Sequence, residues 1–192
     1  MKTTKEKVQD AYQALKGELG YTNTMQAPRL VKAIVSVGTG KVQDKAKLAT
    51  IQDRLARITG QKTSPRPAKK SIASFKLREG DIIGYQVTMR GPRMYSFLDK
   101  LIHIALPQTK DFRGVRVNAI DDMGNITIGI KEHTIFPETA DEDVRDIFSF
   151  AITIVTTAKS KKEAEAFLRH IGLPLQAPGT VEEKKAKRAK KK

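Results

Sequence analysis

Two prolines restrict the conformation of the centre of this chain. The stretch from Gln61 to Arg78 carries six basic side chains and no acidic one. Pro65 and Pro67 exclude a helix there, because a proline inside a helix lacks the backbone N–H and clashes with the preceding turn. The basic side chains are therefore predicted to lie on an extended segment, where they can contact phosphates. They are Lys62, Arg66, Lys69, Lys70, Lys76 and Arg78.

The positive charge extends beyond this stretch. The 192-residue chain has a net charge of +15, of which +5 lies in the last twelve residues. Because the rest of the chain stays strongly basic, nucleic acid is the expected partner, and an anionic membrane surface comes second. A hydrophobic content of 39% is enough for a core, so we expect one domain over residues 1–177 and a disordered basic tail over residues 178–192.

Several classes of protein are excluded or disfavoured. The sequence has no membrane-length apolar run and no secretory signal pattern, so a cytoplasmic location is expected. The absence of cysteine excludes disulfides and thiolate metal sites. His103, His133 and His170 lack the spacing of metal ligands, and neither a metal nor a cofactor is expected.

Four segments place apolar residues at helical spacing. Thr3 and Glu6 have the spacing of a capping box at the start of the first segment, and Ser160 and Glu163 have it at the start of the last. Pro107 is predicted to end the third helix. The predicted helices cover residues 3–19, 44–59, 92–106 and 160–171.

Between the helices, the alternation of apolar and polar residues predicts six strands. Two hairpins are expected, one through a turn at residues 79–81 and one through a turn at residues 121–125. The predicted strands are residues 30–37, 72–77, 82–90, 115–120, 126–130 and 151–156. Because strands and helices do not alternate regularly, the expected fold class is α+β with a largely antiparallel sheet.

One short motif suggests an alternative. Gly38-Thr-Gly-Lys41 follows a predicted strand and precedes a predicted helix, as a phosphate-binding loop would. Its spacing matches neither a P-loop nor a dinucleotide fingerprint. A nucleotide-using enzyme remains the second hypothesis, and a generic polybasic protein that attaches through its tail is the third.

Structured RNA is the favoured nucleic acid. The strand at residues 82–90 ends in Thr88-Met-Arg90, so hydroxyl and guanidinium donors lie beside the basic stretch. Aromatic residues make up only 6% of the chain and are not interleaved as a stacking platform. Recognition of RNA shape and backbone is therefore favoured over the reading of unstacked bases.

An ordered series of motifs resembles the bacterial large-subunit ribosomal protein L-five family, which binds 5S ribosomal RNA. The resemblance runs from about Tyr12 to Leu175, and the order of the motifs makes it specific. The motifs are Pro28-Arg29, Val35-Ser-Val-Gly-Thr-Gly40, Ile58-Thr-Gly-Gln-Lys62, Phe75-Lys-Leu-Arg-Glu-Gly80, Val87-Thr-Met-Arg-Gly91, Arg93-Met-Tyr, Asp111-Phe-Arg-Gly114, Gly124-Asn125, Gly129-Ile-Lys-Glu132, Phe136-Pro-Glu138 and Thr156-Thr-Ala158.

The resemblance implies a non-catalytic protein with a curved antiparallel sheet backed by helices, one face of which lies on 5S rRNA in the central protuberance. The family's RNA-contacting positions correspond to Arg29, Gln61, Thr88 and Arg90. Ser36 stands where the family usually has Asn, so that contact would be made by a hydroxyl or through water.

Two further contacts are implied by the resemblance. A long basic loop over residues 64–74, with Arg66, Lys69, Lys70 and Ser71, would reach transfer RNA in the peptidyl site. The surface around Lys110, Asp111 and Arg113 would meet a protein of the small-subunit head and form an intersubunit bridge. Large-subunit rRNA and neighbouring large-subunit proteins are the other implied partners.

Overall fold

A computed structural model describes residues 2–40, 44–110, 112–139 and 147–176. Its five strands form one open sheet in the order β2-β3-β1-β5-β4, and every neighbouring pair is antiparallel. The strands are β1 (Leu30–Gly38), β2 (Ser64–Pro67), β3 (Ile82–Met89), β4 (Ile126–Ile130) and β5 (Phe150–Thr156). The predicted α+β class with an antiparallel sheet is confirmed. The predicted tail lies outside the described residues.

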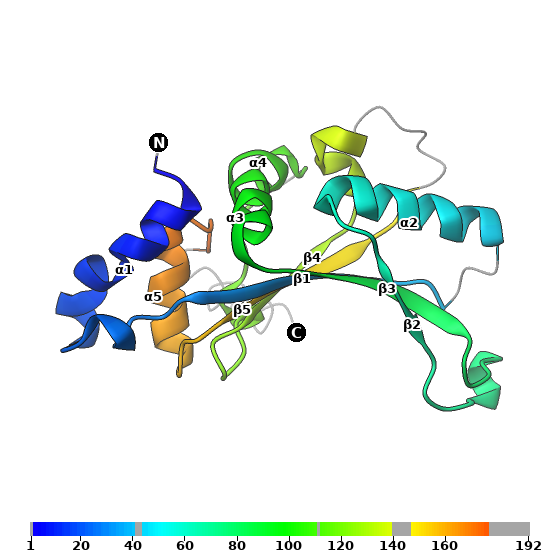
Figure 1. Cartoon of the computed structure of the whole chain (residues 1–192), viewed down its shortest axis with the longest axis horizontal. Helices are drawn as coiled ribbons and strands as arrows, with labels where there is room; N and C mark the ends of the chain where they lie inside the picture. Colours follow the sequence, from blue (N-terminus) through cyan, green and yellow to red (C-terminus); the bar gives the residue numbers. More distant parts are fainter. Residues whose placement is uncertain (1, 41–43, 111, 140–146, 177–192) are drawn as a thin grey trace, which may run out of the picture.

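The helices gather on one side and at one end of the sheet (Figure 1). They are α1 (Thr4–Leu19), α2 (Lys45–Thr59), α3 (Gly91–Lys100), α4 (Leu106–Gln108) and α5 (Lys161–Ile171). Figure 1 shows α2, α3 and α4 above the strands, while α1 and α5 pack against each other at one end.

Two predicted caps explain where α1 and α5 start. The Thr3 hydroxyl accepts a hydrogen bond from the Glu6 N–H, and the Glu6 carboxylate accepts one from the Thr3 N–H, which is the predicted capping box. At α5, Ser160 accepts the Glu163 N–H as predicted. The Glu163 carboxylate, however, accepts the N–H of Lys159 and the hydroxyl of Tyr21, so this box is only half formed.

Pro107 does not end its helix, contrary to the prediction. A π-helical turn at Leu101–Ala105 connects α3 to α4, and the helix continues to Gln108. The Leu106 N–H donates to the Leu101 carbonyl, one residue further back than in an α-helix. This wider turn accommodates the proline ring, which would otherwise collide with a carbonyl of the preceding turn.

The strand predicted at residues 72–77 was wrong, and β2 takes its place beside β3. Only Ile72 and Leu77 pair there, and they close a tight turn around a 3-10 turn, η2 (Ala73–Phe75). Pro65 and Pro67 are tolerated in β2 because it is an edge strand, where one side of the backbone needs no partner. The segment is thus extended around the two prolines, as predicted, but the rest of the basic stretch is not.

The strand predicted at residues 115–120 was also wrong. Val115 makes one parallel bridge to Leu175, and a 3-10 turn, Val117–Ala119, interrupts the segment. The segment returns to β4 only at Ile120, which pairs with Ile126. Tertiary contact with the C-terminal segment thus overrides the alternating pattern of residues.

Lys100 of α3 links neighbouring elements of the helical layer. Its ammonium group donates to the Ile58 carbonyl at 2.8 Å, pairs with the Glu138 carboxylate, and lies over the Phe136 ring at 5.7 Å. The side chain is only 20% exposed, so these partners compensate for the loss of water around its charge. One residue of α3 therefore holds both the end of α2 and the 3-10 turn Pro137–Thr139.

Burial alternates along the strands, and only one face of the sheet is covered. Towards the helices, β1 buries Ala33, Val35 and Val37, while β3 buries Val87 and Met89. Apart from Gly84, the alternate residues of the same strands are partly buried or exposed, and no described helix lies over them (Figure 1). The helix-free side is called the open face below.

Gly84 of β3 leaves no room for a side chain beside β1. It pairs with Gly38, and a Cβ atom at position 84 would lie 2.5 Å from the backbone carbonyl oxygen of Val37. The backbone of Val37 cannot move aside as a flexible side chain could, so only glycine fits at position 84.

We predict that Gly84→Ala lowers the free energy of unfolding by about 1–3 kcal/mol through this clash. Gly129→Ala is the matched control, because Gly129 also lies in a strand but a Cβ there meets nothing within 4 Å. The control should change stability by less than about 0.5 kcal/mol. Urea denaturation of both variants checks this, and equal losses would contradict it.

Candidate nucleic-acid interface

The open face carries neutral hydrogen-bonding groups and no acidic one. Strand register places Ser36 between Gln86 and Ala151, and places Ile34 between Thr88 and Thr153. None of the five strands contains Asp or Glu. The open face consists of Lys32, Ile34, Ser36, Gly38, Ser64, Arg66, Gly84, Gln86, Thr88, Thr127, Gly129, Ala151, Thr153 and Val155.

Two of the predicted RNA-binding arginines border this face at the same end. Ala33 of β1 pairs with Met89 of β3, so the start of β1 lies beside the end of β3. Arg29 precedes β1, Arg90 follows β3, and both are exposed. The Arg29 N–H donates to the Thr157 hydroxyl at 2.8 Å, which holds its backbone in place. This end of the open face therefore has a basic border.

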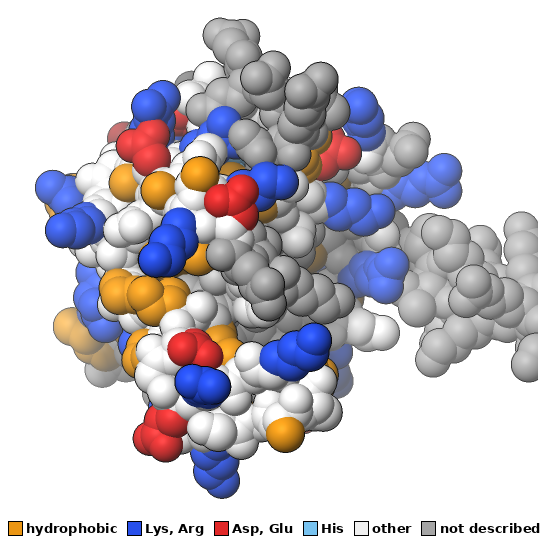
Figure 2. All heavy atoms as spheres, turned by 90° about the vertical axis from the view of Figure 1, so that its right-hand side faces the viewer, with side chains coloured by type: hydrophobic (Ala, Val, Ile, Leu, Met, Phe, Trp, Pro, Cys, Tyr) orange, Lys and Arg blue, Asp and Glu red, His pale blue; other side chains and the backbone are white. Residues whose placement is uncertain are grey.

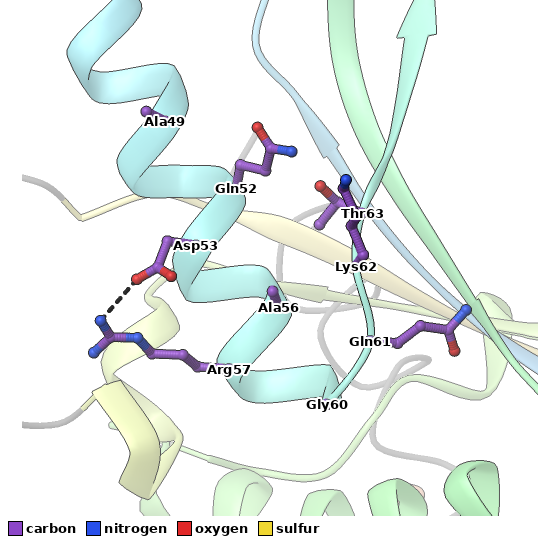
Figure 3. Close-up of a pocket in the computed structure, with 9 residues that line it drawn as sticks. All are labelled: Ala49, Gln52, Asp53, Ala56, Arg57, Gly60, Gln61, Lys62 and Thr63. Carbon is purple, nitrogen blue, oxygen red and sulfur yellow. Dashed lines mark ion pairs between the residues drawn. The ribbon is translucent and has the colours of Figure 1, made fainter.

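Gln61 reaches the same end of the sheet from α2. Ser64 pairs with Gln86 in an antiparallel ladder, so the residues before Ser64 run towards the end of β3 that carries Thr88. Figure 3 shows the Gln61 side chain turned away from α2. Its amide thus lies free of the helix and near the predicted RNA-binding residues.

A shallow groove separates α2 from the segment at residues 60–63 (Figure 3). Gln52 and the ion pair between Asp53 and Arg57, 2.8 Å apart, line its helical side. Lys62 and Thr63 line the other side. The Asp53 carboxylate makes this groove less suited to phosphate than the open face, which has no carboxylate.

The structure thus brings four of the five predicted 5S-binding residues to one end of the sheet. They are Arg29, Gln61, Thr88 and Arg90. Ser36 lies further along the open face and is diagonal to Thr88.

Sequence reasoning missed several other polar residues of the open face. Gln86 lies beside Ser36, and the hydroxyls of Thr127 and Thr153 are 3.0 Å apart on β4 and β5. The alternation within β5 is the signal that could have found Thr153. The pairing of β5 with β1 could not be deduced from that alternation.

The predicted tRNA-contacting residues lie on a hairpin, β2 and β3 with their connection, which projects away from the helices (Figure 1). Arg66, Lys69 and Lys70 are exposed on it. The Ser71 hydroxyl accepts the Glu79 N–H at 2.9 Å, so Ser71 also supports the hairpin structurally. Figure 2 faces this end of the molecule and shows more Lys and Arg than Asp and Glu side chains on it.

Lys110 and Arg113, predicted for the intersubunit bridge, are both exposed. Asp111 lies outside the described residues. The Val115 N–H donates to the Pro174 carbonyl at 2.7 Å, which fixes the end of this segment against the C-terminal residues.

The glycine loop lacks the features of a nucleotide site in its described part. The Thr39 N–H donates to the Ile83 carbonyl at 2.8 Å and so extends the sheet. The Asp44 carboxylate caps α2 by accepting the Ala46 N–H, which puts a negative charge where a phosphate would bind. Lys41 lies outside the described residues.

Within the described residues, neither a metal cluster nor a membrane helix was found. The described residues contain no group of three or more His, Cys, Asp or Glu side chains able to hold a metal ion. In the same ranges, no helix is long and apolar enough to cross a membrane.

Comparison with known proteins identifies relatives over most of the chain. A family model described as ribosomal protein L5 matches residues 23–78, and a second, for the C-terminus of the ribosomal L5 family, matches residues 82–175. The large ribosomal subunit protein uL5 of Anaeromyxobacter sp. (strain K) is 49% identical over 160 residues, or 83% of this chain and 89% of that protein. The uL5 protein of Heliobacterium modesticaldum is 47% identical over 179 residues, or 92% and 99% respectively. The chain therefore belongs to the ribosomal protein L5 family.

Proposed function

We propose that this protein binds 5S rRNA in the central protuberance through its open face. The observation that carries the proposal is a sheet face on which hydroxyl, amide and basic side chains lie among a few apolar residues, without any carboxylate. Such a face attracts a polyanion and offers it many neutral hydrogen bonds.

Family membership supports the general part of this function, which is a role in the large ribosomal subunit. The chain is a protein of the large ribosomal subunit, is located in the cytoplasmic ribosome, and is not an enzyme. Ribosomal RNA and neighbouring ribosomal proteins are accordingly its partners.

The open face suits the shallow minor groove of an RNA helix. That groove displays ribose 2′-hydroxyls, which both donate and accept hydrogen bonds, as do the hydroxyls of Ser36 and Thr88. Gln61 adds an amide at the same end. Arg29 and Arg90 would contact phosphates at the border, where a charge-assisted bond is stronger than a neutral one.

We predict that Arg90→Ala weakens binding of 5S rRNA by about 1.5–3 kcal/mol through the loss of a charge-assisted hydrogen bond. Arg169→Ala is the matched control, because it removes the same charge from α5, where Arg169 pairs with Glu165. Titration at one fixed salt concentration compares the two variants. Equal affinities for both would reject Arg90 as a contact.

The hairpin and the segment at residues 110–113 are proposed to make the other contacts. Arg66, Lys69, Lys70 and Ser71 would meet transfer RNA in the peptidyl site, and the projection of the hairpin from the helical layer gives it the necessary reach (Figure 1). Lys110, Asp111 and Arg113 would meet a protein of the small-subunit head.

The double variant Lys69→Ala and Lys70→Ala should weaken peptidyl-site tRNA binding to the large subunit while leaving 5S rRNA affinity unchanged. Both side chains are exposed on the hairpin and away from the basic border of the open face. Filter binding of each RNA measures the two effects. A fall in 5S affinity instead would refute the separation between the connection of the hairpin, residues 68–81, and the open face.

Residues 1–177 are proposed to form the RNA-binding domain, and residues 178–192 to be a dispensable basic extension. Deletion of residues 178–192 should preserve specific 5S binding and a single unfolding transition, because the open face and core lie in the first part. Competition with unrelated RNA and thermal denaturation check this. Loss of the preference for 5S rRNA would favour a generic polybasic protein.

A further inference from the structure

One phenylalanine is placed unlike the other six. Phe97, Phe136, Phe150 and Phe167 are buried in the core, and Phe112 and Phe148 pack against it. Phe75, at the end of the hairpin, is 75% exposed. Since the fold uses every other phenylalanine for packing, the exposed ring is available for a partner.

Backbone hydrogen bonds hold this ring on a compact loop. Ile72 and Leu77 exchange two hydrogen bonds of 3.0 and 3.2 Å, which close a four-residue loop around Phe75. Lys76 has a φ of 51°, and within the described residues it is the only residue other than glycine with a positive φ. Left-handed backbone is unfavourable for lysine, and such strain is characteristic of functional loops.

A second layer of bonds supports the loop. The Ala68 N–H donates to the Asp81 carbonyl at 2.8 Å, and the Gly80 N–H donates to the Ala68 carbonyl at 3.1 Å. The Asp81 carboxylate accepts the Arg78 N–H. Because so much of the backbone is bonded, little conformational entropy would be lost when Phe75 binds a partner.

The surroundings of the ring indicate what that partner is. Lys69, Lys70, Lys76 and Arg78 are exposed on the same connection, and Glu79 and Asp81 are its only acidic residues. A flat apolar ring on a basic connection matches a nucleobase, which combines a π-face with nearby phosphates. An apolar protein surface would match the ring but would not need the cations.

We propose that Phe75 stacks on the exposed face of a base or base pair of the transfer RNA that the hairpin meets, while the surrounding cations neutralise its phosphates. The inference rests on the proposed function of the hairpin and adds a mode of recognition to it. Stacking tolerates any sequence, because every base has a π-face. The hairpin could therefore receive different transfer RNAs.

The test uses large subunits that contain each variant as their only copy of this protein. Phe75→Leu keeps an apolar side chain but removes the aromatic face, and it should weaken peptidyl-site tRNA binding roughly 5- to 150-fold. Phe75→Trp should retain wild-type affinity. Met123→Ala is the control, because Met123 is also exposed, at 73%, but lies in a different turn.

The outcomes separate this inference from the function on which it rests. Suppose that Phe75→Leu binds tRNA with wild-type affinity while the double variant of Lys69 and Lys70 binds it weakly. This result would overturn the stacking inference but leave the tRNA contact of the hairpin standing. Wild-type affinity of both would overturn the tRNA contact of the hairpin and the inference with it. Affinity for 5S rRNA, measured for every variant, should stay unchanged, and its loss would also overturn the inference.

Discussion

The antiparallel pairing of β1 with β3 on one side and β5 on the other is the interaction on which the structure depends. Every residue of β1 that points to the helices is apolar and buried, so this strand holds the sheet and its core together. The same register places the alternate residues of three strands side by side on the open face. Stability and the proposed RNA contact thus use opposite faces of one strand.

The open face stays uncovered in the described structure because the helices are held elsewhere. Lys100 joins α3 to the end of α2 and to Glu138, which keeps these elements above the sheet. Contacts between α1 and α5 hold those helices at one end. An antiparallel sheet can present one face to solvent, and here that face has the composition for RNA.

The hairpin differs from the open face in how it would recognise RNA. The open face presents many neutral groups on a broad surface, which suits a permanent partner that dissociates rarely. The hairpin end presents one aromatic ring and separate cations on a small loop. A small contact of this kind suits a partner that must leave, because dissociation is faster when fewer interactions must break at once.

The sequence alone determined the helix starts, the extended conformation around Pro65, and the basic character of the surface. These features depend on neighbouring residues, as in the capping box of Thr3 and Glu6. The family motifs also identified the four residues that gather at one end of the sheet, although nothing in their spacing showed that they would meet.

Only the tertiary structure decided which segments pair. Residues 72–77 and 115–120 alternate as strands do, yet one folds into a tight turn and the other binds the C-terminal segment. Pro107 remains inside a helix because a π-turn makes room for its ring. Strand pairing joins residues far apart in the chain, so its energy depends on partners that local sequence does not reveal. The exposure of Phe75 was decided in the same way, because the chain positions of the seven phenylalanines do not distinguish it from those in the core.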